Sequence, residues 1–197
     1  MSRQVADRSR EVRGGHAHPV RRVAIGVSVL VALGATITAM MLSSRPTSSD
    51  ETRRAPDFSL VDTSGARHSL EDHRGENLLL YFSEGAGCQS CIVQMGEIEK
   101  HAEEFADQDV TVLPIVMNTR EQITADMAAN GVRTPFLLDD GTVSAAYGTL
   151  GRGMHAGLPG HSFVLIDAEG RQRWYGEYPS MWLAPQDLLE EIRSRLS

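Results

Sequence analysis

The longest feature in the pattern of hydrophobic and polar positions is a run of twenty uncharged residues, from Val23 to Leu42. At about 1.5 Å per residue, a helix of this length spans about 30 Å, the thickness of the hydrocarbon core of a bilayer. The run therefore predicts a transmembrane helix over residues 23–42. Two alternatives, a cleaved secretory signal and a twin-arginine signal at Arg21-Arg22, give the same topology and stay open.

After this run the pattern changes to short apolar stretches separated by turns. Residues 43–55 are mainly Ser, Thr and charged residues, which is typical of a flexible linker. From residue 56 to residue 197, apolar stretches of strand length alternate with stretches of helical spacing. We therefore expect a single α/β domain over residues 56–197.

The strongest elements of this domain come from three apolar runs and two periodic segments. The runs at 78–82, 110–116 and 163–166 predict strands, and the first is apolar at every position, as in a strand buried on both faces. Apolar residues recur three and four positions apart over 92–105 and over 184–196, which predicts two amphipathic helices. Shorter elements are also expected: a hairpin across 58–70, a helix over 120–130, an apolar run at 136–138, a brief helix at 143–147 and a return strand at 171–175.

Charge is divided unevenly along the chain. Residues 1–45 carry seven arginines and two acids, whereas residues 46–197 carry twelve basic residues and 24 acids, so the two parts have net charges of +5 and −12. Six of the arginines precede the apolar run, so residues 1–22 are expected to form a cytoplasmic basic tail and the domain to lie outside the cytoplasm. The acidic domain repels phosphate backbones, which argues against nucleic acid as a partner.

The only two cysteines, Cys88 and Cys91, are separated by two residues and lie at the predicted start of a helix. Backbone N–H groups and the helix dipole stabilise a thiolate at this place, and the spacing lets Cys91 displace a partner bound to Cys88. The pair therefore predicts a dithiol/disulfide switch. Alternatives are a structural disulfide, although it would close only a short loop, and a metal site, although the nearest candidate ligands, His155 and His161, lie outside finger-like spacing.

Four motifs occur in an order that matches a known family. They are the segment Ala55–Leu60, the strand at 78–82, the cysteine pair and the strand at 163–166 with the turn ending at Gly170. In this order and spacing the chain resembles the thioredoxin-fold redoxins, which include membrane-tethered thiol–disulfide oxidoreductases and peroxiredoxins. The resemblance covers about residues 55–195. It implies a thioredoxin fold, with a mixed sheet sandwiched between helices, and catalysis by the cysteine pair without cofactor or metal.

The chain departs from that family at several positions around the cysteines. Gly87 stands where the oxidoreductases usually carry an aromatic residue. The oxidoreductases usually carry a cis-proline, and the peroxiredoxins an arginine, at the position that corresponds to His161 in this chain. Pro159 lies two residues before it. Either the loop brings Pro159 opposite the cysteines, or His161 faces them and stabilises a thiolate or relays a proton. Glu84 is a further candidate base, with a solvated loop carboxylate as the alternative.

Three functions are compatible with these features. The first is a single-pass cell-membrane thiol–disulfide oxidoreductase that exchanges disulfides with protein or small-molecule thiols, with Cys88 attacking and Cys91 resolving. The second is a peroxiredoxin-like peroxidase with Cys91 attacking peroxide, although Glu84 and Cys88 replace the proline and hydroxyl residue of that motif. The third is a copper-binding, chaperone-like module using Cys88, Cys91 and His161. The direction of exchange stays open, because the residues between the cysteines are uncharged.

Overall fold

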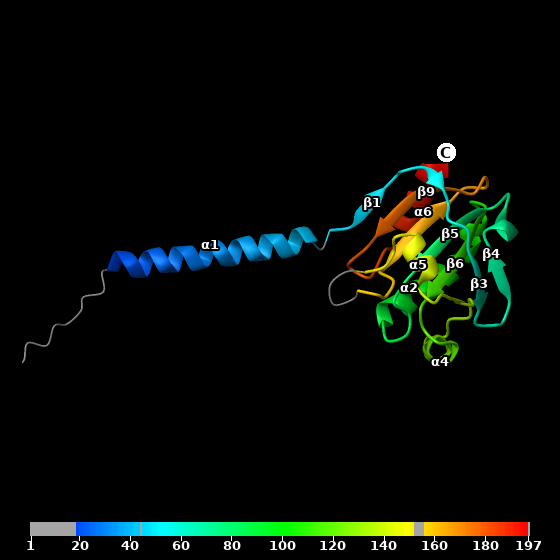
Figure 1. Cartoon of the computed structure of the whole chain (residues 1–197), viewed down its shortest axis with the longest axis horizontal. Helices are drawn as coiled ribbons and strands as arrows, with labels where there is room; N and C mark the ends of the chain where they lie inside the picture. The colour runs from blue at the N-terminus through cyan, green and yellow to red at the C-terminus, as the bar shows by residue number, and fades with distance from the viewer. Residues whose placement is uncertain (1–18, 44, 152–155, 197) are drawn as a thin grey trace, which may run out of the picture. The chain divides into compact units, whose positions relative to one another are not determined.

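The computed structural model describes residues 19–43, 45–151 and 156–196, and the chain divides into two compact units at Ser43. The first unit contributes the helix α1 (Pro19–Ser43) (Figure 1). Its segment Ala24–Leu42 is long and apolar enough to cross a membrane, and none of it is buried. The helix expected over 23–42 is therefore present, and α1 is a candidate membrane anchor. Most of the basic tail predicted over 1–22 lies outside the described residues.

The second unit is built on one mixed sheet (Figure 1). Its strands lie in the order β1-β9-β8-β5-β6-β7-β3-β4, and β2 also pairs with β9. The central strand β5 runs parallel to β6 and antiparallel to β8. The strand bounds are β1 Thr47–Ser49, β2 Arg53–Arg54, β3 Ser59–Asp62, β4 Arg67–Ser69, β5 Asn77–Phe82, β6 Val110–Val116, β7 Leu137–Leu138, β8 Ser162–Ile166 and β9 Arg171–Glu177.

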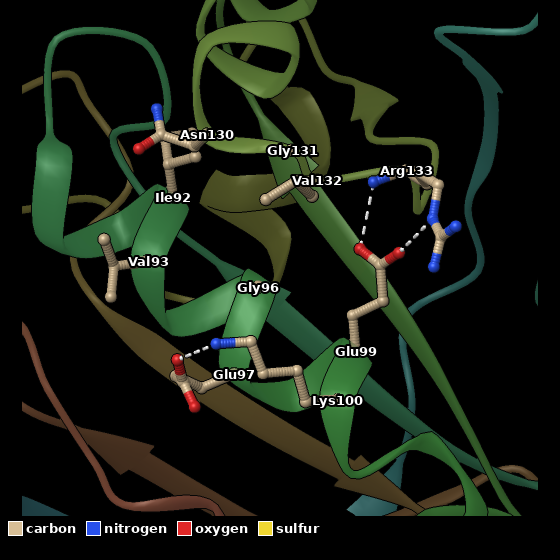
Figure 2. A pocket seen from close by; sticks show the side chains of 10 residues that line it. All are labelled: Ile92, Val93, Gly96, Glu97, Glu99, Lys100, Asn130, Gly131, Val132 and Arg133. Atoms are coloured by element: carbon tan, nitrogen blue, oxygen red, sulfur yellow. Dashed lines mark hydrogen bonds and ion pairs between the residues drawn. The ribbon is translucent and has the colours of Figure 1, made fainter.

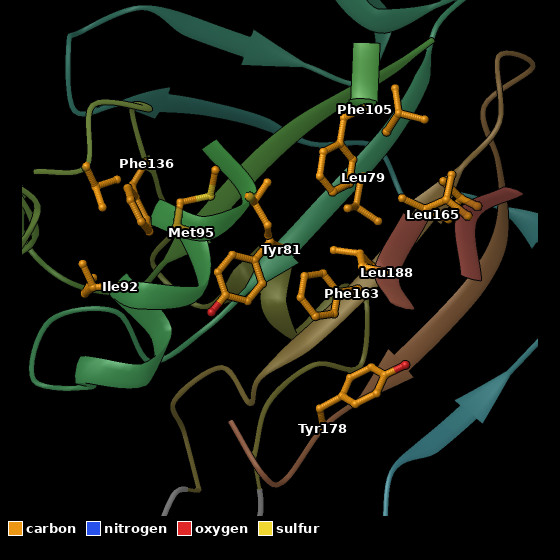
Figure 3. Close-up of a cluster of buried hydrophobic side chains, with 14 of the residues drawn as sticks. Leu79, Tyr81, Ile92, Met95, Phe105, Phe136, Phe163, Leu165, Tyr178 and Leu188 are labelled. Carbon is orange, nitrogen blue, oxygen red and sulfur yellow. The ribbon is translucent and has the colours of Figure 1, made fainter. Parts of the chain in front are cut away.

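Helices cover both faces of this sheet, which confirms the predicted α/β architecture. Their bounds are α2 Gln89–Lys100, α3 Ala102–Ala106, α4 Arg120–Asn130, α5 Thr142–Ala146 and α6 Pro185–Leu196, with a short 3₁₀ helix at Glu71–His73. One buried cluster joins the sheet to α2, α4 and α6 (Figure 3), and a second joins its other face to α5. Side chains of β5 alternate between them, since Tyr81 belongs to the first and Phe82 to the second.

The helix expected over 92–105 is wrong in one respect, because two helices, α2 and α3, occupy that segment. The break lies at His101, whose backbone has φ −103° and ψ 17°. The ring Nδ1 of His101 donates to the carbonyl of Glu97 at 2.8 Å, the group that would accept the His101 N–H in a continuous helix. The side chain therefore competes with the backbone and ends α2.

The flexible linker predicted over 43–55 is also wrong in part, because β1 and β2 pair with β9. Ser48 Oγ accepts a hydrogen bond from Trp174 Nε1 at 2.9 Å. Ala55 is buried, and its N–H donates to the carbonyl of Gly170. The side chains of β1 are all exposed, so the segment has the composition of a linker although its backbone belongs to the sheet.

Removal of β1 is expected to destabilise the second unit. A fragment of residues 52–197 lacks Ser48, so its free energy of unfolding should be lower than that of residues 44–197 by about 1–2 kcal/mol, because the Trp174 indole loses its acceptor. Urea titration followed by tryptophan fluorescence measures the difference. Ser49→Ala in the longer fragment is the control, since it leaves the Trp174 contact in place. Equal stability of the two fragments would contradict a structural role for β1.

Candidate active site

The two cysteines lie at the junction of β5 and α2, where the central strand leads into a helix (Figure 1). Cys88 is the N-cap of α2, and its carbonyl accepts the N–H groups of Cys91 and Ile92 at 3.0 and 3.3 Å. Its Sγ accepts the N–H of Cys91 at 3.3 Å. The first sulfur therefore lies against the positive end of the helix, where negative charge on it is stabilised.

The cysteines form a disulfide in this structure, with their Cα atoms 5.3 Å apart. The two residues differ in exposure, because Cys91 is 0% exposed and Cys88 is half-buried. A partner molecule can therefore reach Cys88 but not Cys91. The structure thus brings the two residues of the predicted pair together and makes them chemically unequal.

The loop from β5 to Cys88 is fixed by two polar side chains that sequence reasoning missed. Gly85 has φ +70°, and a Cβ at this position would be 2.1 Å from Asn118 Oδ1, so only glycine fits. Asn118 Oδ1 accepts the N–H of Ala86 at 2.8 Å, and the Asp126 carboxylate accepts the N–H of Gly87 at 2.9 Å. The two glycines were the available signal for such a tightly bonded loop.

Glu84, a predicted candidate base, lies in this same loop between β5 and α2 and is half-buried. Pro159, the other loop candidate, is buried and forms an isolated antiparallel bridge with Leu150. The peptide bonds of the described residues, including that before Pro159, are all trans. Residues 156–196 therefore contain no cis-proline.

His161 is connected to the cysteines through Tyr81. Its Nδ1 lies 3.2 Å from Tyr81 Oη, and the same hydroxyl donates to the carbonyl of Cys91 at 3.1 Å. The two rings meet edge to face, with centroids 5.1 Å apart. His161 is 1% exposed, and burial lowers its pKa to about 4, so the ring is neutral at pH 7. Tyr81 was read from the sequence only as part of an apolar strand.

Gln94, one turn after Cys91 on α2, adds a further polar group to this region. Its Oε1 accepts the N–H of Leu183 at 2.8 Å, which ties the segment between β9 and α6 to α2. The side chain is 0% exposed, and its Nε2 has no hydrogen-bond partner. The polar groups beneath α2 are thus uncharged at pH 7.

A groove of about 300 Å³ lies between α2 and the segment after α4 (Figure 2). Ile92, Val93 and Val132 are among the residues that line it. Its charged side chains pair with one another, Glu99 with Arg133 at 3.2 Å and Glu97 with Lys100 at 2.6 Å. Neither cysteine lines the groove.

Within residues 19–43, 45–151 and 156–196, no group of three or more His, Cys, Asp or Glu side chains is arranged to hold a metal ion. His161 Nδ1 bonds to Tyr81, and the cysteines bond to each other. The copper-binding set of Cys88, Cys91 and His161 is therefore not assembled in this structure. His155 lies outside the described residues.

The chain is similar to several known proteins. Thiol-disulfide oxidoreductase ResA of Geobacillus thermodenitrificans is 30% identical over 142 residues, covering 61% of this chain and 80% of that protein. Alkyl hydroperoxide reductase E of Mycobacterium bovis is 29% identical over 120 residues, covering 59% and 77%. The solved structure of peroxidoxin BcpB from Mycobacterium tuberculosis has the same fold, with a TM-score of 0.61 at 20% identity over 74% of this chain and 97% of its own. Because the model of the AhpC/TSA family matches residues 52–174, more than half of the chain, the protein belongs to the AhpC/TSA family.

Proposed function

We propose that this protein is a membrane-tethered, extracytoplasmic thiol–disulfide oxidoreductase in which Cys88 attacks the substrate and Cys91 resolves the intermediate. The observation that carries the proposal is the unequal exposure of the two sulfurs at the start of α2, since Cys88 is half-buried and Cys91 is 0% exposed. Its relatives include a protein named thiol-disulfide oxidoreductase. Its substrates are disulfides and thiols of proteins or small molecules.

The proposed reaction has two exchange steps. The Cys88 thiolate attacks a substrate disulfide, forms a mixed disulfide and releases one substrate thiolate. Cys91 then attacks Cys88 Sγ, which forms the disulfide seen in the structure and releases the second substrate thiolate. The substrate gains two electrons and the enzyme loses them. The same steps in reverse oxidise a substrate dithiol.

The proposed location rests on α1 and on the charges around it. The apolar part of α1, Ala24–Leu42, is long enough to cross a membrane. Six arginines precede the apolar segment, which favours a cytoplasmic N-terminus and an extracytoplasmic second unit. Disulfides persist in such oxidising compartments, where a thiol–disulfide exchange enzyme finds its substrates.

A thiol peroxidase using Cys91 is the second candidate, because a relative is named alkyl hydroperoxide reductase. That chemistry requires peroxide to reach the attacking sulfur. Cys91 is 0% exposed beneath the start of α2, so its burial favours the first candidate.

The roles of the two cysteines are separable by substitution. Cys91→Ser in the full-length chain is expected to accumulate a one-to-one mixed disulfide with glutathione, because the resolving sulfur is gone. Cys88→Ser is expected to lose exchange, because Cys91 is buried. Intact-protein mass spectrometry of the detergent-solubilised chain after addition of glutathione disulfide reads out both. Ser90→Ala is the control and keeps exchange. Rapid adduct formation on Cys91 in Cys88→Ser would reverse the assigned roles.

Reactivity toward peroxide separates the two candidate functions. We expect the reduced chain to lose thiols to hydrogen peroxide at a rate similar to that of free cysteine at the same pH, because Cys91 is buried. Thiol titration over time measures the rate, and dimedone labelling in Cys88→Ser reports sulfenic acid on Cys91. A rate orders of magnitude above that of free cysteine, together with a label on Cys91, would support the peroxidase instead.

A further inference from the structure

The backbone immediately before Cys88 leaves open space beside the accessible sulfur. Gly87 is exposed and has φ +90°, and a Cβ added to it would meet no described atom within 4 Å. Cys88 itself is half-buried, and the two residues that follow it, Gln89 and Ser90, are exposed. The described residues therefore leave room over Gly87 for the residues that flank a substrate cysteine.

The carboxylate of Asp126, on α4, lies against this same backbone. Its Oδ2 accepts the N–H of Gly87 at 2.9 Å. Because Gly87 and Cys88 are consecutive, covalent geometry places this oxygen within about 11 Å of Cys88 Sγ. The other oxygen, Oδ1, accepts no hydrogen bond from the described residues, and it is not among their buried unpaired atoms. One oxygen of Asp126 is therefore free to bind a ligand near the accessible sulfur.

The charge of Asp126 has no ion-pair partner in the part of the chain that the structure describes. Basic residues do occur on α2, on α4 and just after α4, but each binds another group. Lys100 pairs with Glu97, Arg120 donates to the carbonyl of Thr63, and Arg133 pairs with Glu99. Asp126 thus places a negative charge beside the sulfur that a partner molecule can reach.

We propose that Asp126 makes the protein prefer polypeptide disulfides in which a basic residue flanks the cysteine that Cys88 attacks. The inference rests on the proposed function and adds a substrate class to it. In the mixed disulfide the substrate sulfur lies about 2 Å from Cys88 Sγ. A neighbouring Lys or Arg has a long, flexible side chain that reaches Asp126 Oδ1 from there, whereas a Glu at the same place meets a like charge. Asp126 takes no part in the exchange of bonds.

The test compares three peptide disulfides that differ in charge. Each is the symmetric disulfide of a short peptide whose cysteine is flanked on both sides by Lys, by Gln or by Glu. The reduced full-length chain, in an uncharged detergent at about 10 mM salt, is mixed with each disulfide, and the release of peptide thiol gives the initial rate. Division by the rate for the Gln peptide removes any change in the reactivity of Cys88 that is common to all three.

The unsubstituted chain is expected to react faster with the Lys peptide than with the Glu peptide. Asp126→Asn keeps an acceptor for the Gly87 N–H but removes the charge, so the ratio of these two rates should fall about fivefold. The preference should also shrink at about 1 M salt, since salt screens exposed charges.

A matched variant controls for the net charge of the acidic second unit. Asp107, at the end of α3, precedes the start of β6, which pairs with the start of β5. The cysteine loop follows the other end of β5. Asp107→Asn therefore removes the same charge at the opposite end of these strands, and the ratio for the Lys and Glu peptides should stay unchanged.

The outcomes distinguish this inference from the proposed function. Equal rates for the Lys and Glu peptides at low salt in the unsubstituted chain would overturn the inference and leave the cysteine roles intact; this comparison stands even if Asp126→Asn does not fold. An unchanged ratio in folded Asp126→Asn, or an equal fall in Asp107→Asn, would overturn it too. The absence of reaction with all three peptides would overturn the proposed function itself.

Two small disulfides test whether the preferred substrate is a polypeptide. Cystamine carries amines and 3,3′-dithiodipropionate carries carboxylates, both close to their sulfurs. We expect the ratio of their rates to change less in Asp126→Asn than the ratio for the Lys and Glu peptides. A fall as large as that for the peptides would overturn the assignment of Asp126 to polypeptide substrates.

Discussion

The double-sided burial of β5 is the constraint on which the rest of the site depends. The strand is paired on both edges, with β6 and with β8, and its side chains enter two separate clusters. A shift of one residue would move Tyr81 and Phe82 into each other's cluster, so the register is strongly fixed. The end of the strand is therefore fixed in position. The close fit of Gly85 to Asn118, and the hydrogen bond that Asn118 accepts from the loop, fix the short connection from the strand to Cys88.

The start of α2 then gives the side chains of Cys88 and Cys91 different surroundings, although the two residues are of the same type. Cys88, as the N-cap, lies outside the helix and against its free N–H groups. Cys91 lies one turn further, on the side of α2 that packs against the sheet, together with Ile92 and Met95 of the first buried cluster. The helix dipole therefore stabilises a thiolate on the accessible sulfur, while the buried sulfur is surrounded by uncharged groups. The difference in burial follows from the helical geometry alone.

Much of this arrangement was predictable from the sequence, and the failures have a common cause. The apolar run at 78–82 and the spacing of apolar residues after Cys88 both indicate which side chains are buried, so β5 and α2 were predictable. The pairing of β1 with β9 was not predictable, because exposed Ser and Thr side chains give no sign that their backbone belongs to a sheet. The bonds of Asn118 and Asp126 to the cysteine loop, and of His161 to Tyr81, join residues 32 to 80 positions apart. Periodicity does not report such long-range polar contacts.

A buried histidine suits this uncharged region better than a carboxylate would. A neutral imidazole has no charge to desolvate at pH 7, whereas an ionised carboxylate buried at the same place would lose the hydration of its charge. Burial lowers the pKa of His161 to about 4, so the ring is neutral at pH 7. Burial of the histidine instead lowers the free energy of unfolding at acidic pH. The unfolded chain binds this proton at about pH 6.5 and the folded chain does so only at about pH 4, so His161 lowers the stability of the fold progressively across that interval.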